Sequence, residues 1–144
     1  MHLITIIIPY FKKKKFIKET LLSVLNQTYK NFEVIIVYDD LDHTDLNYIK
    51  KLEQLDTRIS LIINEKNLGA GLSRNKAILS ARGEYIAFLD SDDTWEDAKL
   101  ENQLKFMQIN NFNISHTSYQ IMDNKNNKIK KRIARSFNNV NELL

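Results

Sequence analysis

Cysteine is absent from the 144 residues of this chain. Its absence excludes a disulfide framework and thiolate catalysis within the chain. A zinc site would have to rely on histidine, and His2, His43 and His116 do not have the spacing of metal ligands. We therefore expect neither a structural disulfide nor a zinc centre.

Long apolar runs, linkers and repeats are also missing. No run approaches the roughly 18 residues that a membrane-spanning helix needs. The apolar start Leu3–Ile8 is too short for a signal peptide and ends at Pro9. Hydrophobic residues make up 43% of the chain and charged residues 27%, which is typical of a soluble globular domain. We therefore expect a cytoplasmic protein.

The positive charge is modest, with a formal net value of +3. It is concentrated in Lys12–Lys15 and between Lys125 and Arg135. The four-lysine run is either a solvated loop or a source of one phosphate contact, and the sequence does not indicate which lysine would make it. The second basic segment lacks interleaved aromatic residues, so we expect no nucleic-acid partner, while contact with anionic lipid stays open.

Apolar strand segments alternate four times with segments of helical period. The expected strands are Leu3–Ile8, Phe32–Val37, Ile59–Ile63 and Tyr85–Leu89, and the expected helices are Phe16–Leu25, Leu46–Leu52, Leu72–Ala81 and Glu96–Ile109. This alternation predicts an α/β fold with a mostly parallel open sheet, right-handed crossovers and helices on both faces. Because its apolar run is continuous, Tyr85–Leu89 is expected to be a buried central strand.

The pattern changes after Asn110. Ile114–Met122 and Lys128–Ala134 read as two strands joined by a polar turn at 123–127, which predicts an antiparallel hairpin at the edge of the sheet. The chain then divides into βα units over 1–109, an edge hairpin over 110–135 and the opening of a cut-off segment over 136–144. We interpret this as a single truncated domain.

Three carboxylates follow the fourth expected strand, at Asp90, Asp92 and Asp93. Clustered carboxylates repel one another unless a positive charge lies between them, and oxygen ligands suit Mg²⁺ or Mn²⁺. Our hypothesis is that Asp90 and Asp92 hold a divalent cation and that the cation holds a diphosphate. The alternative is a helix cap, with Asp93 or Thr94 as the N-cap residue.

Other residues that could bind a ligand lie at the same predicted edge of the sheet. Asp39–Asp40 follows the second strand and Pro9–Tyr10 ends the first, so these residues and the acidic turn could surround one crevice. The Asp pair could accept hydrogen bonds from a base or ribose, or it could simply form a turn.

The segment Gly69–Gly71 precedes the third expected helix. The third glycine position of a dinucleotide fingerprint is held by Arg74, which argues against a nicotinamide-dinucleotide site. Arg74 would either enter the crevice, where it could pair with a phosphate or stack on a base, or stay solvated on the helix face.

These stretches together resemble the family 2 glycosyltransferases, inverting enzymes of the GT-A fold that use nucleotide-diphospho-sugars. The matching stretches are Ile6–Pro9, Leu22–Tyr29 (LSVLNQTY), Asn31–Glu33, Asp39–Asp40, Asn67–Asn75 (NLGAGLSRN) and Ala81–Asp93 (ARGEYIAFLDSDD). They occur in the order of the family and cover roughly residues 3 to 104.

The resemblance implies a metal site and a donor site. Asp90-Ser91-Asp92 corresponds to the Asp-X-Asp motif of the family, with Asp92 as the direct ligand of Mn²⁺ or Mg²⁺ and Asp90 near the ribose and the metal's waters. Residues implied in nucleotide-sugar binding are Pro9, Tyr10, Asp39, Asp40, Arg74, Asp90 and Ser91.

Two departures from the family pattern matter. The family reads Asp-Asp-Gly-Ser-X-Asp after the second strand, whereas residues 39–45 are one residue longer and lack the glycine. Counting from Glu33 favours Asp39 over Asp40 as the base-reading acid. The general base of the family lies in the acceptor half, which we expect beyond Leu144, so no catalytic residue is assigned.

The resemblance implies transfer of a sugar from a nucleotide-diphospho-sugar, with a UDP-sugar favoured, to a hydroxyl of a saccharide or lipid-linked acceptor, with inversion. The expected setting is bacterial surface polysaccharide or glycoconjugate synthesis, at the inner face of the membrane through peripheral contact of a full-length protein. A sugar nucleotidyltransferase is an alternative, although Pro9–Phe11 lacks the glycine that a triphosphate loop needs. The second alternative is a non-catalytic module that binds nucleotides or takes part in assembly.

Overall fold

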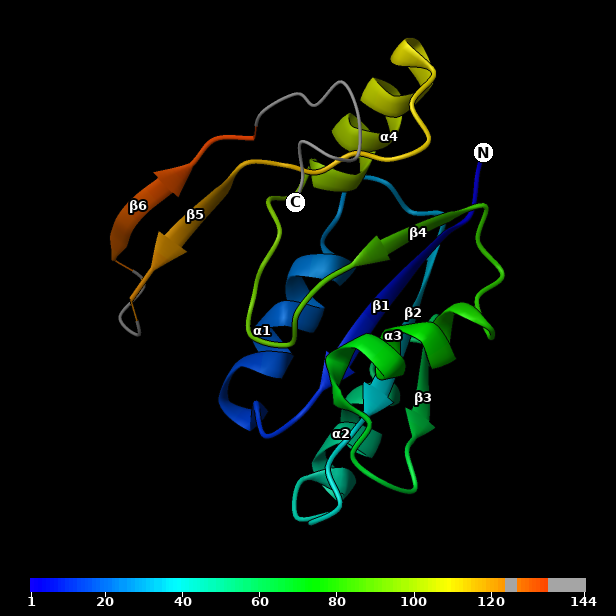
Figure 1. The fold of residues 1–144 in the computed structure, drawn as a ribbon, viewed down its shortest axis with the longest axis vertical. Coiled ribbons are helices and arrows are strands. Elements are labelled where there is room, and N and C mark those ends of the chain that lie inside the picture. The colour runs from blue at the N-terminus through cyan, green and yellow to red at the C-terminus, as the bar shows by residue number, and fades with distance from the viewer. Residues whose placement is uncertain (124–126, 135–144) are drawn as a thin grey trace. The chain divides into compact units, whose positions relative to one another are not determined.

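The computed structural model describes residues 1–123 and 127–134 and divides into two compact units, Met1–Glu101 and Asn102–Leu144. Figure 1 shows the elements along the chain. They are β1 (Ile4–Tyr10), α1 (Lys14–Leu25), β2 (Phe32–Tyr38), α2 (Leu46–Glu53), β3 (Ile59–Ile63), α3 (Gly69–Ile78), β4 (Tyr85–Phe88), α4 (Lys99–Asn110), β5 (Tyr119–Met122) and β6 (Lys128–Arg132).

The first unit contains a four-stranded parallel sheet with the strand order β3-β2-β1-β4. β1 pairs with β2 from Ile4 opposite Phe32 to Tyr10 opposite Tyr38, and with β4 on its other side. Because every strand runs in the same direction, all four carboxyl ends lie at one edge of the sheet. The predicted parallel α/β architecture is confirmed.

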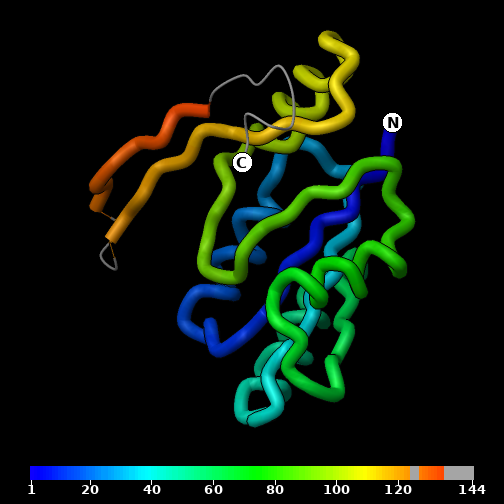
Figure 2. Tube along the Cα trace, viewed as in Figure 1, coloured from blue at the N-terminus to red at the C-terminus, as the bar shows by residue number. Residues whose placement is uncertain are grey.

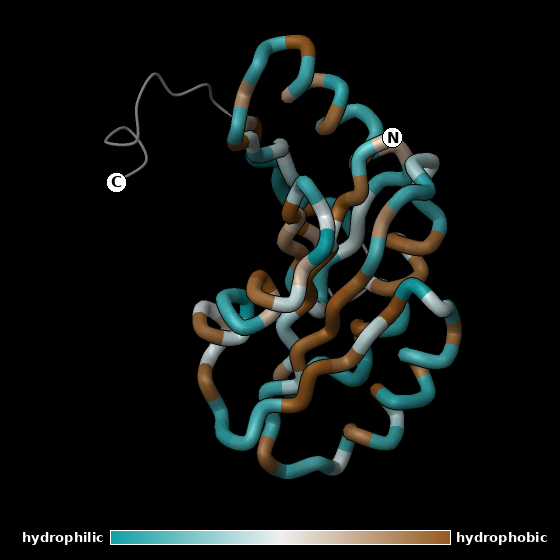
Figure 3. Tube along the Cα trace, turned by 90° about the vertical axis from the view of Figure 1, so that its right-hand side faces the viewer, coloured by the Kyte–Doolittle hydropathy of each residue, from teal (hydrophilic) through white to brown (hydrophobic). Residues whose placement is uncertain are grey.

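The core lies on both faces of β1 and β2, which are buried at every position. On one face, Ile7 and Ile35 pack with Ala77 of α3. α1 and α2 lie on the opposite face of the sheet and contribute the buried side chains of Ile17 and Ile49. In Figure 3 the central strands are mostly brown, as expected for strands covered by helices on both faces.

The expectation that Tyr85–Leu89 forms a buried central strand is wrong. β4 covers Tyr85–Phe88 and forms an edge of the four-stranded sheet within the described residues, pairing with β1 alone. Ile86 is 36% exposed and Phe88 is 49% exposed. An apolar run predicts a strand, but strand order depends on pairing partners far away in the sequence.

The boundaries of α3 differ from the expected Leu72–Ala81, since the helix begins at Gly69 and ends at Ile78. Gly69 and Gly71 therefore lie in its first turn rather than before it. Gly83 does not end the helix. A Cβ at Gly83 would lie 2.5 Å from the backbone nitrogen of Thr5, so this glycine is needed where the chain passes close to β1.

The predicted hairpin is confirmed as an antiparallel pair, β5 with β6, but its strands are shorter than expected. It forms a separate two-stranded sheet, so the expected place at the edge of the main sheet is wrong. The cut-off segment expected over 136–144 lies outside the described residues. In the part of the chain that the structure describes, no helix is long and apolar enough to cross a membrane.

Candidate functional site

A cleft of about 230 Å³ opens at the carboxyl edge of the parallel sheet, within the unit Met1–Glu101. Its lining residues come from the ends of β1, β2 and β4 and from α3, which is the place where open α/β sheets bind ligands. They are Pro9, Tyr10, Phe11, Lys13, Asp39, Ala70, Arg74, Asp90, Ser91 and Asp92. The structure thus brings together every sequence-predicted site residue except Asp40.

The acidic turn at Asp90–Asp93, which follows β4, is anchored to α1. Ser91 is buried, and its carbonyl accepts a hydrogen bond from Oγ1 of Thr20 on α1 at 3.1 Å. The backbone N–H of Asp93 donates to the carbonyl of Asp90 at 3.1 Å, which closes the turn. Figure 2 shows this segment passing alongside α1. The carboxylates of Asp90 and Asp92 are therefore left at the cleft while the backbone between them is held.

The helix-cap alternative for these acids is wrong. α4 begins at Lys99, six residues beyond Asp93, so neither Asp93 nor Thr94 caps it. The expected start at Glu96 was three residues too early. Capping therefore does not explain why three carboxylates follow β4.

Each of the two predicted metal ligands carries a basic partner in this structure. Nζ of Lys13 lies 2.7 Å from Oδ2 of Asp92, and a terminal nitrogen of Arg74 donates to Oδ1 of Asp90 at 2.5 Å. Partial burial, followed by the charges of Asp92 and Asp90, raises the pKa of the Asp93 carboxyl. The turn is thus a strongly negative position that already attracts cationic groups.

The donor set fits a hard divalent cation that is only partly held by protein. In the described residues no three His, Asp or Glu side chains gather closely enough to hold a metal by themselves. Asp90 and Asp92 supply oxygen ligands at a cleft edge, and Mg²⁺ sites commonly complete their coordination with water and substrate phosphates. A cation bound here would complete its coordination with water or with a phosphate-bearing ligand.

Asp39 has a structural role and also lines the cleft. Its buried carboxylate accepts hydrogen bonds from the backbone N–H groups of Leu68 and Gly69 and from the side chain of Asn64, each at 2.8 Å. It therefore satisfies donors at the amino end of α3, which explains why the helix begins at Gly69.

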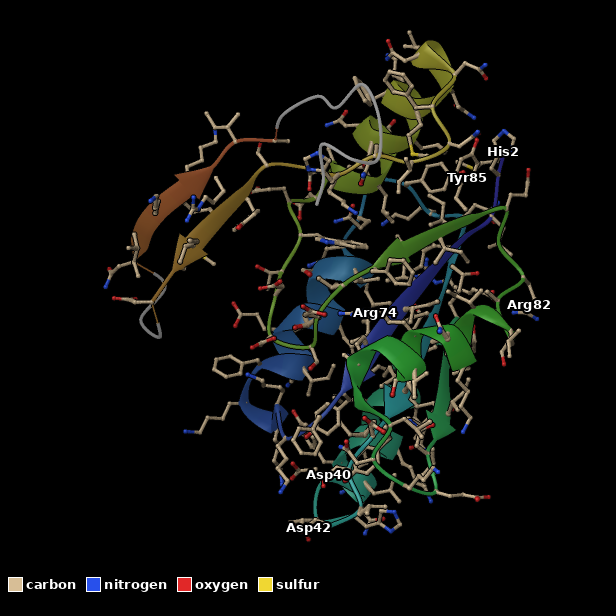
Figure 4. The ribbon with its side chains drawn as sticks, in the orientation of Figure 1. His2, Asp40, Asp42, Arg74, Arg82 and Tyr85 are labelled. Carbon is tan, nitrogen blue, oxygen red and sulfur yellow. The ribbon has the colours of Figure 1, made fainter. Side chains whose placement is uncertain are left out.

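Asp40 does not line the cleft. Its side chain is buried, and its carboxylate accepts the backbone N–H of Asp42 at 3.2 Å, which is an Asx turn. Figure 4 shows Asp40 at the start of the loop between β2 and α2, apart from Arg74. The turn interpretation therefore describes Asp40, and the cleft position belongs to Asp39.

Tyr10 is held on two sides. Its ring stacks on Tyr38 with a centroid separation of 5.3 Å, and its hydroxyl donates to Oδ2 of Asp45 at 2.8 Å. Asp45 also pairs with Nζ of Lys14 at 2.8 Å. Burial, and then the hydrogen bond to Asp45, raises the pKa of the Tyr10 hydroxyl, so it remains a neutral donor.

Arg74 reaches the cleft from α3. Its guanidinium carbon lies 5.9 Å from the ring centroid of Phe88, and its Nε is buried without a hydrogen-bond partner among the described residues. Arg74 belongs to the cleft lining and keeps an unused donor, so it is suited to bind an additional acceptor.

The sequence left open which lysine of the run 12–15 could reach the cleft, and it did not single out Asp45. Lys13 belongs to a run of four identical residues, so no local signal distinguishes it from its neighbours. Asp45 contacts Tyr10 across 35 residues of sequence, and no local signal indicates such a contact.

Comparisons with known proteins agree with this geometry. The family model "Glycosyl transferase family 2" matches residues 5–143. The Escherichia coli enzyme WfgD, named as UDP-Glc:alpha-D-GlcNAc-diphosphoundecaprenol beta-1,3-glucosyltransferase, is 40% identical over 99% of this chain and 55% of its own length.

Solved structures of similar fold include two that contain a nucleotide or nucleotide-sugar. S. aureus TarS 1-349 in complex with UDP has 30% sequence identity and a TM-score of 0.65, covering 76% of this chain and 32% of that one. The mannosyltransferase PcManGT from Pyrobaculum calidifontis, in complex with GDP-Man and Mn²⁺, has 24% identity and a TM-score of 0.66 over 72% of this chain and 32% of its own, and shows the fold alone.

This chain spans about half the length of several curated relatives that it matches, and about a fifth of others. The family match nevertheless extends over almost all of it. The fold, the order of the motifs and the family match lead to one conclusion: the chain belongs to glycosyl transferase family 2 and has the GT-A fold.

Proposed function

We propose that this chain binds the donor of an inverting, metal-dependent glycosyltransferase, a nucleotide-diphospho-sugar whose sugar passes to an acceptor hydroxyl. The observation that carries the proposal is the convergence of Asp39, Arg74, Asp90 and Asp92 on one cleft at the carboxyl edge of the sheet. We propose that βα units over 1–109 form the donor-binding part, with the hairpin over 110–135 following it.

Each residue has a proposed role in holding the donor. Asp92, with Asp90, would hold Mn²⁺ or Mg²⁺, which when bound supplies positive charge to the leaving diphosphate. Asp39, Pro9 and Tyr10 would line the base pocket. Ser91 holds the turn that presents the two acids, and its contact with α1 limits how far they can move.

Arg74 is proposed to contact the nucleotide through the donors that it presents at the cleft. Asp40, which forms a turn, is left without a ligand contact. We assign no catalytic base within this chain, and Glu142 lies outside the described residues.

The donor and acceptor classes follow the relatives. TarS has been crystallised with UDP, and the name of WfgD includes a UDP-sugar donor and a lipid-diphosphate acceptor. We therefore propose a UDP-sugar donor and a saccharide or lipid-linked acceptor for surface polysaccharide or glycoconjugate synthesis. The full-length protein would work in the cytoplasm, at the inner face of the membrane.

Calorimetry of UDP and GDP, with and without Mn²⁺, tests the proposal. We expect one of the two nucleotides to bind at least about tenfold more tightly with Mn²⁺, because the cation neutralises repulsion between the diphosphate and the two aspartates. A nucleotide affinity that is indifferent to the metal would contradict the metal site. Because no base is assigned within this chain, we expect little or no sugar transfer, and slow hydrolysis of the sugar nucleotide is the discriminating measurement. Metal-dependent binding without any such hydrolysis would support the non-catalytic module.

Asp92→Asn provides the sharper measurement. The variant should bind nucleotide with less than about a twofold response to Mn²⁺, because it removes the charge of the direct ligand. Asp97→Asn is the matched control, since it removes the same charge from the same acidic segment at a residue outside the cleft lining. Equal Mn²⁺ responses in the two variants, with unchanged circular dichroism, would refute the assignment of Asp92.

A further inference from the structure

The four consecutive lysines 12–15 have different surroundings although the sequence does not distinguish them. Lys14 pairs with Asp45, and Nζ of Lys12 lies 5.4 Å from the ring centroid of Phe11. Lys15 is exposed. Lys13 alone of the four belongs to the lining of the cleft, where its ammonium contacts Asp92.

The ammonium of Lys13 lies where it competes with a metal ion. It is 2.7 Å from Oδ2 of Asp92, one of the carboxylate oxygens proposed to hold the divalent cation. An oxygen that accepts a short charge-assisted hydrogen bond is less available to a second cation, and two cations at contact distance repel each other. A metal ion bound through this oxygen would therefore compete with Lys13.

Lys13 is free to move once it is displaced. Its side chain is 44% exposed and flexible, whereas that of Arg74 is 29% exposed and lies beside Phe88. The backbone of Lys13 lies at the N-cap position of α1, and its side chain makes no capping hydrogen bond there, so the four-carbon stem is not tied to the helix. A diphosphate held in the cleft would be an alternative anionic partner for this side chain, because Lys13 belongs to the cleft lining.

We propose that Lys13 is a phosphate-binding residue for the donor, held by Asp92 until metal and nucleotide bind together. The ammonium then exchanges the carboxylate of Asp92 for an oxygen of the diphosphate. This inference rests on the proposed function, because it requires a diphosphate at the cleft. Its consequence is that Lys13 opposes binding of the metal alone and supports binding of the nucleotide with metal.

Lys13→Ala should therefore move two affinities in opposite directions. Mn²⁺ alone, followed by electron paramagnetic resonance of the free ion, should bind about threefold more tightly because a competing cation is gone. UDP or GDP, whichever the unaltered chain prefers, should bind about tenfold more weakly at saturating Mn²⁺ in calorimetry. Lys13→Arg should restore most of the nucleotide affinity.

Lys15→Ala is the matched control, since it removes the same charge two residues away, outside the cleft lining. It should leave both affinities within about twofold, because surface charges are largely screened at physiological salt. If Lys13→Ala behaves like Lys15→Ala while the unaltered chain binds nucleotide in a metal-dependent way, the role of Lys13 is refuted and the proposed function stands. If the unaltered chain shows no metal-dependent nucleotide binding, the proposed function fails, and the role of Lys13 fails with it.

Discussion

The Tyr10 side chain combines an apolar and a polar restraint at a single residue. Its ring is fully buried against Tyr38, and its hydroxyl donates to Asp45. The hydrogen bonds from Lys14 and then from Tyr10 lower the pKa of the Asp45 carboxyl. The orientation of this cleft residue is therefore coupled to a charged pair outside the cleft lining.

Tyr10→Phe tests this coupling. Loss of the hydroxyl should lower the free energy of unfolding by about 1 to 3 kcal/mol, because a hydrogen bond to an ionised group is lost while the ring packing is kept. Chemical denaturation monitored by fluorescence measures the change.

Tyr38→Phe is the control for that prediction. The Tyr38 hydroxyl is buried and makes no hydrogen bond of normal geometry in the part of the chain that the structure describes, its contact being with the backbone of Asp45, so its removal should cost much less than removal of the Tyr10 hydroxyl. An equal loss of stability in the two variants would show that the contact with Asp45 is not what stabilises Tyr10.

At the scale of elements, a polar network joins β1, β2 and the segment that leads into β4. The Thr5 hydroxyl donates to Glu33 at 2.7 Å and accepts the backbone N–H of Gly83 at 2.9 Å. Arg82 donates to the same carboxylate from its backbone and its guanidinium. This network sets β4 beside β1, and β4 in turn carries the acidic turn to the cleft.

Gly83→Ala should disrupt that arrangement. The added Cβ would lie 2.5 Å from the nitrogen of Thr5 and 2.9 Å from the carbonyl oxygen of Leu3, both backbone atoms that cannot move aside cheaply. We expect a loss of about 3 kcal/mol in the free energy of unfolding, measured by urea denaturation.

Gly71→Ala is the matched control for Gly83→Ala. Gly71 lies within α3, and a Cβ there would meet no atom within 4 Å. The substitution should be neutral or stabilising by up to about 1 kcal/mol, because alanine favours the helix. Similar losses at both glycines would contradict the close approach inferred at Gly83.

At the scale of the whole molecule, Glu33 and Asp56 join Asp45 as carboxylates whose lowered pKa makes stability depend on pH. Burial opposes ionisation of Glu33, but hydrogen bonds from Arg82 and Thr5 outweigh it and lower its pKa from 4.5. Hydrogen bonds from the side chain and backbone of Arg58 lower the pKa of Asp56 to about 2. Both groups therefore favour the folded state when they are ionised.

The free energy of unfolding should accordingly be insensitive to these groups above about pH 5 and should fall as the pH drops from about 4.5 toward 2. The unfolded state takes up protons at ordinary carboxyl pKa values, whereas the folded state resists protonation. Asp56 alone should account for a loss on the order of 2 kcal/mol. Urea denaturation at a series of pH values measures the slope.

Asp56→Asn should make the free energy of unfolding depend less steeply on pH in this acid range. The pH at which the loss of stability begins should not change. The variant retains Glu33, so a residual acid dependence should remain below about pH 4.5. A pH profile identical to that of the unaltered chain would show that the contacts with Arg58 do not perturb Asp56 in solution.

The sequence by itself determined the local elements and the types of residue at their ends. The strands expected at Leu3–Ile8 and Phe32–Val37 followed from their apolar runs, although β1 continues through Pro9 to Tyr10 and β2 continues to Tyr38. The acids at Asp90 and Asp92 followed from their place after an apolar run. These predictions succeed because periodicity and strand ends depend on neighbours along the chain.

Only the tertiary structure decided which residues meet. It placed β4 at an edge, put Asp39 rather than Asp40 in the cleft lining and selected Lys13 from four identical neighbours. Each outcome depends on contacts between residues far apart in the sequence, such as Lys13 with Asp92 or Gly83 with Thr5. Such contacts are set by strand order and chain direction in three dimensions, which no local pattern of residues contains.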